Sequence, residues 1–264
     1  MVLLGTMMNM LATLGKYSLA TVKEIGKISM FSAKGFRCCL TPPFYFKEMR
    51  RHMVVVGFYS LPIVALTALF AGMIIALQTY VGFTRFNAEG AVATVVVICI
   101  TRELGPVFAG LMVTGRVSSA IAAEVGSMKV SDQIDALTTL GVNPFRFLVA
   151  PRMIAGMLMV PFLVLIADII GVMGGFLIST SVLDFSAGSY INQTVQNLEA
   201  IDVISGLVKA SFFGFCMSAF GCYHGFYSDV GARGVGNATT SAVVASCIGV
   251  LALDYLLTAV FFGK

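Results

Sequence analysis

The sequence predicts an all-α integral membrane protein, because it is too apolar for a water-soluble domain of its length. Hydrophobic residues make up 58% of the 264 residues, charged residues make up 11%, and the mean hydropathy is +0.93. Long uncharged stretches alternate with short polar connections. Since about 20 apolar residues cross a bilayer as a helix, we predict five transmembrane helices after an N-terminal interfacial amphipathic helix.

Residues 1–52 are predicted to form this cytoplasmic, interfacial segment. Its lysines fall on one narrow stripe of a helix: Lys16, Lys23, Lys27 and Lys34. Aliphatic residues such as Val22 and Ile25 fall on the opposite side, an arrangement typical of helices that lie in the membrane interface. A helix packed on a soluble domain is the alternative, but the composition provides no such domain. A signal peptide is not predicted, because no basic region precedes the first apolar run.

Residues 53–264 are predicted to form one five-span domain. The predicted spans cover residues 53–84, 90–117, 153–183, 203–223 and 238–262. Small residues four apart, such as Gly171 and Gly175 in the third span or Gly214 and Ser218 in the fourth, favour close helix packing. Between the second and third spans, residues 132–140 predict a short cytoplasmic helix, with Asp132 and Asp135 at its positive end.

The basic residues predict the orientation of the chain. With the N-terminus in the cytoplasm, most of the 17 Lys and Arg residues lie in cytoplasmic segments, and only Arg85 and Lys264 lie outside. An odd number of spans then puts the C-terminus on the opposite, periplasmic side of the membrane.

Five charged residues lie within the predicted spans: Arg102, Glu103, Asp168, Lys209 and Asp254. An ionised side chain at the centre of a spanning helix costs roughly 2.5–3.5 kcal/mol on insertion scales, so such residues usually have partners and face a protein interior or a wet cavity. Two interpretations stay open. The charges neutralise one another as scaffolding, or they form a cavity for a zwitterionic or anionic head group.

Several other site classes are not predicted. The chain has no G-x-x-x-x-G-K-[ST] sequence, and the glycine-rich stretch 231–236 follows no strand, so we interpret it as a tight cytoplasmic turn. The two histidines, His52 and His224, and six cysteines without C-x-x-C spacing predict neither a metal centre nor a disulfide framework. No nucleophile–base pattern indicates an enzyme, and the cations are not clustered as in nucleic-acid-binding proteins.

Four motifs resemble the MlaE (YrbE-type) permease family: Thr101-Arg-Glu-Leu-Gly-Pro-Val107, Gly115-Arg-Val-Ser-Ser-Ala-Ile-Ala-Ala-Glu124, Gln133-Ile-Asp-Ala-Leu137 and Asp254-Tyr-Leu-Leu-Thr258. The resemblance covers nearly the whole chain. It implies the permease subunit of an inner-membrane ABC transporter that moves phospholipids between the inner and outer membranes and maintains outer-membrane lipid asymmetry. The implied assembly is a homodimer with cytoplasmic ATPase subunits, a periplasmic MCE-domain lipid-binding protein and often a STAS-domain subunit. ATP and Mg would be bound by the ATPase, and no cofactor by this chain.

The resemblance also implies which residues bind lipid: Arg102, Glu103, Leu104, Lys209, Ile75, Phe83 and Phe86. We predict the ATPase contact at the 132–140 helix, the one ordered polar feature between spans, with these residues on or beside it: Glu124, Asp132, Gln133 and Asp135. The roles of Asp168 and Asp254 stay open. The alternative function is an ion- or proton-coupled secondary transporter that uses the intramembrane carboxylates, although five spans form no obvious inverted repeat.

Overall fold

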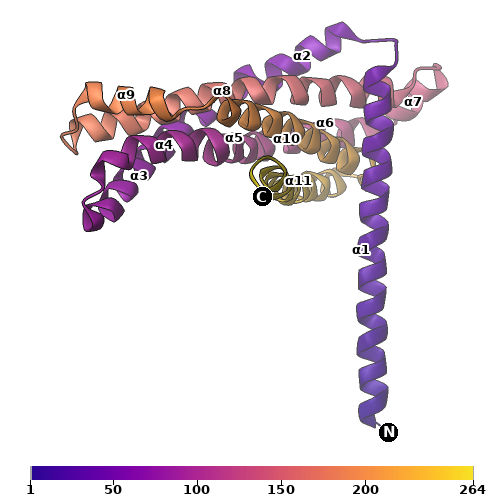
Figure 1. Ribbon diagram of the computed structural model, residues 1–264. Coiled ribbons are helices and arrows are strands. Elements are labelled where there is room, and N and C mark those ends of the chain that lie inside the picture. The colour runs from indigo at the N-terminus through magenta and orange to yellow at the C-terminus, as the bar shows by residue number, and fades with distance from the viewer. Residues whose placement is uncertain (1, 264) are drawn as a thin grey trace.

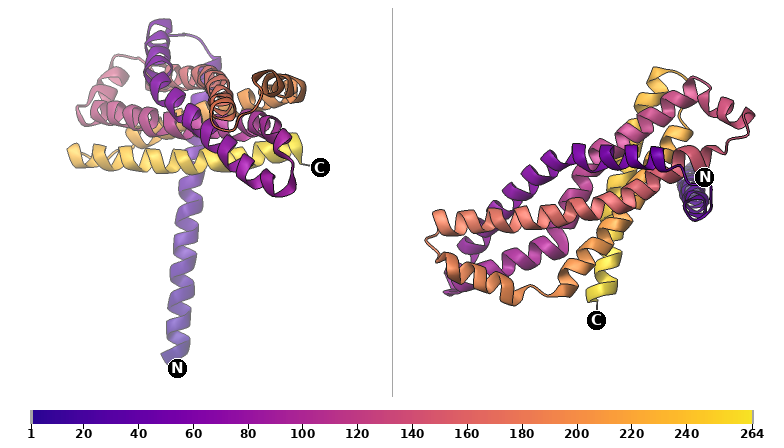
Figure 2. Two further views of the ribbon diagram at one scale, coloured as in Figure 1. Left: turned by 90° about the vertical axis from the view of Figure 1, so that its left-hand side faces the viewer. Right: turned by 90° about the horizontal axis from the view of Figure 1, so that it is seen from above.

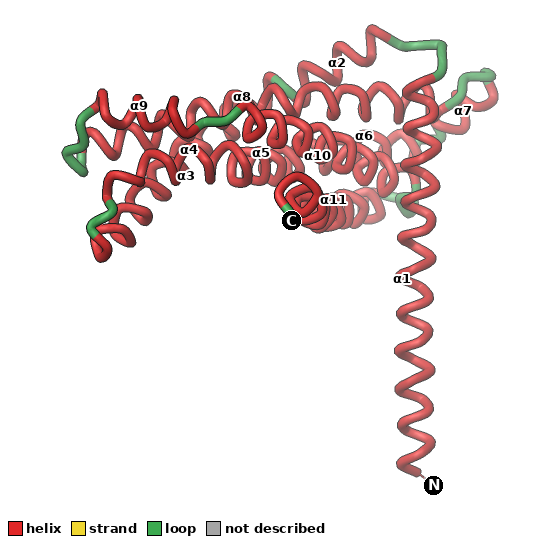
Figure 3. Tube along the Cα trace, viewed as in Figure 1, coloured by secondary structure: helices red, strands yellow, loops and turns green. Residues whose placement is uncertain are grey.

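The computed structural model describes residues 2–263, and the described chain consists of helices joined by short loops and turns, without strands (Figures 1 and 3). Five helical segments are long and apolar enough to cross a membrane: Phe46–Phe86, Val92–Val130, Phe145–Ser181, Ala200–Phe226 and Ala232–Phe262. The predicted all-α class and the five predicted spans are therefore confirmed.

The spans are built from these elements in chain order: α2 (Phe46–Val56) and α3 (Leu61–Phe83), then α4 (Val92–Cys99), α5 (Gly105–Val113) and α6 (Ser119–Val130), then α8 (Ala150–Ser181), α10 (Ala200–Phe226) and α11 (Ala232–Phe262). A short 3-10 turn at Phe58–Ser60 joins α2 to α3. Two π-helical turns, Ile100–Leu104 and Thr114–Ser118, interrupt the second span. A third π-helical turn, Phe145–Val149, precedes α8.

Parts of the architecture differ from the prediction. The predicted division between residues 52 and 53 falls inside α2, since that helix begins at Phe46. The turn predicted over residues 231–236 is wrong, because only Gly231 keeps a turn conformation, with φ of 89°, and α11 begins at the next residue. The segment α9 (Ala187–Asn197) was not predicted as a helix. Its Tyr190 packs against Phe176 of α8, so tertiary contacts stabilise a helix that the polar sequence alone does not indicate.

The long helix α8 packs against α3 on one side and α10 on the other. Glycines make both contacts close. A Cβ atom on Gly72 of α3 would collide with the backbone of Gly171, and a Cβ atom on Gly156 would collide with the backbone of Gly214 on α10. The close helix packing predicted from small residues is confirmed at Gly171 and Gly214.

The N-terminal helix α1 (Val2–Leu40) runs nearly at right angles to the spans and extends away from them (Figures 1 and 2). Its C-terminal half contacts the bundle. Phe31 is buried in an aromatic cluster with Phe145 and Tyr223, and Glu24 accepts a hydrogen bond from the Tyr223 hydroxyl at 3.0 Å. The structure therefore contains the predicted helix, and its position at the membrane interface stays a prediction.

Candidate functional site

The π-helical turn Ile100–Leu104 carries the adjacent charges Arg102 and Glu103 in the middle of the second span. Pro106 follows this turn and has no backbone N–H, so the Arg102 carbonyl, four residues earlier, lacks its α-helical donor. Lys209 of α10 supplies a replacement, with its Nζ 3.0 Å from that carbonyl oxygen. The local sequence thus creates the acceptor that holds a buried lysine against the turn.

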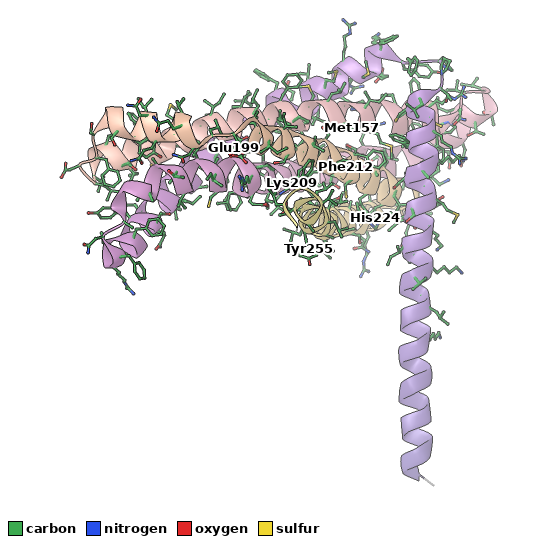
Figure 4. The ribbon with its side chains drawn as sticks, in the orientation of Figure 1. Met157, Glu199, Lys209, Phe212, His224 and Tyr255 are labelled. Atoms are coloured by element: carbon green, nitrogen blue, oxygen red, sulfur yellow. The ribbon has the colours of Figure 1, made fainter. Side chains whose placement is uncertain are left out.

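Lys209 of α10, labelled in Figure 4, is fully buried, and its ammonium group lies between two carboxylates. Its Nζ is 2.8 Å from Glu103 Oε2 and 3.1 Å from Asp254 Oδ1, so α4–α6, α10 and α11 meet at this ammonium group. The Thr258 hydroxyl of α11 donates to Glu103 Oε1 at 3.1 Å. A buried cation is stable only when paired and hydrogen-bonded, and Lys209 meets both conditions.

Arg102 pairs with a second buried group on α10. Its Nε lies 2.6 Å from Asp202 Oδ1, and Asp202 has no solvent exposure. The other Asp202 oxygen accepts the backbone N–H of Glu199 at 3.2 Å, as part of a capping box at the start of α10. The Arg102 guanidinium also lies 4.6 Å from the centre of the Phe262 ring, a cation–π contact.

Together these residues form what we call the central charge cluster: Arg102, Glu103, Asp202, Lys209 and Asp254. Its two most exposed members lie on the second span, since 31% of the Arg102 side chain and 37% of the Glu103 side chain are accessible, compared with 18% of the Asp254 side chain. Each has a fully buried counter-ion on α10, Asp202 behind Arg102 and Lys209 behind Glu103. The second span therefore presents the two charges, and α10 positions them from behind.

The predicted apolar lipid contacts lie along α3 and beside the π-helical turn. Ile75 packs against a buried cluster that includes Ile100, the first residue of that turn. Leu104 is half-buried and lines a small apolar cavity next to Ala109. Phe83 is half-buried near the end of α3, and Phe86 is 78% exposed beyond it. The structure thus brings Ile75 and Leu104 to the turn, whereas Phe83 and Phe86 lie farther out along the chain.

The two carboxylates of open role occupy different environments. Asp254 belongs to the central charge cluster through Lys209. Asp168 of α8 is buried against Gly105, where a Cβ atom would collide with its carboxylate, and neither of its oxygens has a hydrogen-bond partner within the described chain. Asp168 therefore lies beside the π-helical turn but has no ion pair with the cluster.

The predicted coupling residues separate into two groups. Asp132, Gln133 and Asp135 are exposed on or next to α7 (Gln133–Thr139), and Ile134 of that helix is buried in the core. Glu124 instead lies on α6, where its carboxylate is 2.9 Å from the guanidinium of buried Arg152 on α8. The structure therefore has an exposed polar surface at α7, whereas Glu124 forms an ion pair between two spans.

Sequence reasoning missed three members or neighbours of the site: Asp202, Thr258 and Phe262. A signal existed for Asp202, because Glu199 and Asp202 are three apart before an apolar run, the spacing of a capping box. That spacing predicts a helix start, whereas the burial of Asp202 and its pairing with Arg102 depend on how α10 packs against the second span. Thr258 ends the motif that begins at Asp254, but that motif does not indicate its contact with Glu103, and no local pattern distinguishes Phe262 from its neighbours.

Comparisons with known proteins agree with this architecture. The family described as "Permease MlaE" matches residues 49–260. The chain is 52% identical over 256 residues to a "Probable ABC transporter permease protein" of Rickettsia bellii, covering 97% of this chain and 99% of that protein. It is 35% identical over 220 residues to the "Intermembrane phospholipid transport system permease protein MlaE" of Haemophilus influenzae, covering 83% and 84%.

The similarity also extends to a plant protein. The chain is 37% identical over 203 residues to "Protein TRIGALACTOSYLDIACYLGLYCEROL 1, chloroplastic" of Arabidopsis thaliana, covering 77% of this chain and 58% of that protein. The family match spans all five apolar helices and includes the π-helical turn with Arg102 and Glu103. This multi-pass membrane protein belongs to the MlaE family of ABC transporter permeases.

Proposed function

We propose that this chain is the membrane subunit of an ABC transporter that moves phospholipids between the inner and outer membranes and so supports outer-membrane lipid asymmetry. The central charge cluster is the observation that carries the proposal. It holds two opposite charges, Arg102 and Glu103, partly exposed at mid-span, where hydrocarbon alone would be a poor environment for them. The name of the similar Haemophilus protein, a phospholipid transport permease, supports the same substrate class.

The exposure of these charges supports a homodimer. A single chain in a bilayer would present Arg102 and Glu103 to lipid tails, at a cost of several kcal/mol. The apolar helix α11 is also poorly covered within one chain, because only 11% of the residues in its most apolar stretch are buried. A second copy packed over this face would enclose both pairs of charges in a shared cavity between the two chains.

The charges favour a zwitterionic head group. The central charge cluster contains two cations and three carboxylates, a formal sum of −1, so a phosphate alone would meet an unfavourable balance. In our proposal Arg102 binds the phosphate and Glu103 binds a head-group ammonium. Lys209 and Asp202 act behind them as positioning residues, Leu104 and Ile75 contact the acyl chains nearby, and Phe83 and Phe86 contact them farther out.

Energy for transport would come from separate subunits. A cytoplasmic ATPase would bind ATP and Mg and would push on the exposed surface formed by α7, with Asp132, Gln133 and Asp135 as contacts. Glu124 would carry the movement to α8 through its ion pair with Arg152. A periplasmic MCE-domain protein would exchange lipid at the outer ends of the spans, and a STAS-domain subunit would join on the cytoplasmic side. In this arrangement the N-terminus lies on the cytoplasmic side of the inner membrane and the C-terminus lies on the periplasmic side.

The substrate proposal is tested with charge reversals at the cluster. Glu103→Lys and Lys209→Glu are compared singly and together, and complex assembly and co-purified lipid are both measured, the lipid by mass spectrometry. We expect Glu103→Lys to retain the assembled complex and to lose bound phospholipid. Loss of the complex in both single variants, with rescue of both assembly and bound lipid in the double variant, would show that the charges are scaffolding.

The coupling proposal is tested at α7. Asp132 has a φ of 56°, a conformation that Asn tolerates and Lys does not, so the informative variant is Asp132→Asn combined with Asp135→Lys. We expect it to reduce co-purification of the ATPase or to separate ATP hydrolysis from lipid transport. Gln196→Lys on exposed α9 is the matched control and should change neither measurement. Normal coupling in the α7 variant would place the ATPase contact elsewhere.

A further inference from the structure

A second feature, separate from the central charge cluster, is a groove of about 420 Å³ between α1, α8, α10 and α11. Its walls are aromatic: Phe36 comes from α1, and Phe212, Phe215 and Phe220 come from α10. Phe36 and Phe215 meet edge to face with their ring centres 5.8 Å apart. The lining offers almost no polar surface, so the groove suits hydrocarbon and not water.

The direction of α1 places this groove near one membrane surface. The helix crosses the spans nearly at right angles (Figures 1 and 2), and its exposed apolar residues Val22, Ile25 and Phe36 share one side. That side contributes Phe36 to the groove, whereas Lys23 and Lys27 lie on the other side. If α1 lies at the cytoplasmic interface, as the proposed orientation requires, the groove opens just inside the hydrocarbon of the cytoplasmic leaflet.

The rim of the groove carries a cation. Arg37 is exposed, and none of the ion pairs among the described residues includes it. Ala33 lines the groove, and residues four apart are neighbours on a helix surface, so Arg37 lies beside the opening. A lipid whose chain entered the groove would therefore have its phosphate at the level of a guanidinium, the side chain that binds phosphate with two parallel hydrogen bonds.

We propose that this groove binds one acyl chain of an anionic phospholipid from the cytoplasmic leaflet, with the phosphate held by Arg37. The bound lipid is a resident component and not the transported substrate, because none of the central charge cluster lines the groove. It fills the corner between α1 and the spans and so fixes the angle of α1. The orientation of α1 rests on the proposed function, but the groove and its lining do not.

The chain contains no tryptophan, which allows a direct test. Phe215→Trp puts a tryptophan into the groove, and Phe162→Trp puts one at an exposed position of α8 outside the groove. Each full-length variant is reconstituted in phosphatidylcholine vesicles with a minor fraction of phosphatidylglycerol brominated on one acyl chain. We expect quenching at least twice as strong for Phe215→Trp as for Phe162→Trp, and equal quenching when the brominated lipid is phosphatidylcholine.

Three further substitutions identify the cause. In the Phe215→Trp background, Ala33→Phe fills the groove and should abolish the excess quenching, whereas Ala20→Phe, at an exposed position on the same helix outside the groove, should preserve it. Arg37→Gln should remove the preference for phosphatidylglycerol. Equal quenching at both tryptophans would mean bulk lipid only, and absence of quenching at Phe215→Trp would mean that protein covers the groove. Either result overturns the proposal.

Two controls distinguish a failure of the groove proposal from a variant that does not fold and from a failure of the transport proposal. Phe212→Trp, whose native side chain is 47% exposed in the groove, repeats the measurement if Phe215→Trp does not fold. Glu103→Lys in the Phe215→Trp background should leave the excess quenching intact. If transport proves not to involve the central charge cluster, this quenching is still observed, because it reports only on the groove.

Discussion

The second span contains two π-helical turns, and each carries an arginine with a different kind of partner. In the first turn Arg102 pairs with a carboxylate, Asp202, and stays partly exposed beside Glu103. In the second turn Arg116 donates to neutral groups, the Val55 carbonyl and the Ser60 hydroxyl, at the junction of α2 and α3. The first arrangement leaves a charged side chain partly exposed at mid-span, and the second stabilises the junction between two helices.

This contrast shows how the same backbone irregularity supports two tasks. A π-helical turn shifts the helix register and alters which backbone groups are paired, a feature that is frequent at functional sites. Only the first turn is followed by Pro106, so only there does a missing N–H leave a carbonyl for a buried ammonium. Stability should therefore depend most on Lys209, less on the neutral junction, and least on ion pairs at the surface.

The largest expected effect follows from Lys209→Met. This change leaves Glu103, Asp254 and the Arg102 carbonyl without their shared cation, and breaking a buried pair typically costs about 3–5 kcal/mol. We expect the midpoint of thermal unfolding, followed by loss of monodisperse protein on size exclusion, to fall by about 10 °C. A stability equal to the unchanged protein would show that the cluster contributes no net pairing energy.

A smaller effect is expected from Arg152→Met near the α7 end of the spans. The lost contacts are the ion pair with Glu124 and a hydrogen bond to the Leu148 carbonyl. The Glu124 side chain is 41% exposed and regains water when its partner is removed, so we expect a loss of about 1–3 kcal/mol. The same unfolding measurement checks this. A loss of stability as large as that of Lys209→Met would mean that solvent exposure does not determine how much each ion pair contributes to stability.

Ser60→Ala tests the neutral junction. Ser60 is fully buried and accepts from Arg116 Nη2 at 2.7 Å, while Arg116 keeps its bond to the Val55 carbonyl. One acceptor is lost and another is retained, so the expected destabilisation is about 1 kcal/mol. Ser119→Ala, whose hydroxyl bonds only within its own helix, is the control and should change the unfolding midpoint less.

The smallest effect is expected from Lys129→Met, which removes an exposed ion pair with Asp135 at 3.5 Å. Exposed pairs contribute about 0.2–1 kcal/mol at most, so its unfolding midpoint should lie close to that of the unchanged protein. Since Lys129→Met and Lys209→Met make the same chemical change, the difference between them measures the combined effect of burial and of the additional partners of Lys209. Equal midpoints for these two variants would contradict the contrast between the regions.

The sequence by itself determined the class of fold and the most distinctive part of the site. Hydropathy and helix length predict five spans, because crossing a bilayer requires about 20 apolar residues whatever surrounds them. Arg102 and Glu103 stand out for the same reason, since charge is costly inside a span. The glycines at positions 171 and 214 also predict close packing without knowledge of the partner helix.

The tertiary structure alone decided which charges pair and which stay exposed. From the sequence, Asp202 is a polar residue in the loop before a span. In the structure it is fully buried against Arg102, which lies a hundred residues earlier in the chain. From the sequence, Lys209 is predicted to bind lipid directly. In the structure its side chain has no solvent exposure and lies behind Glu103. Local patterns report on a residue's own helix, whereas burial and ion pairing depend on how α10 and α11 pack against the second span.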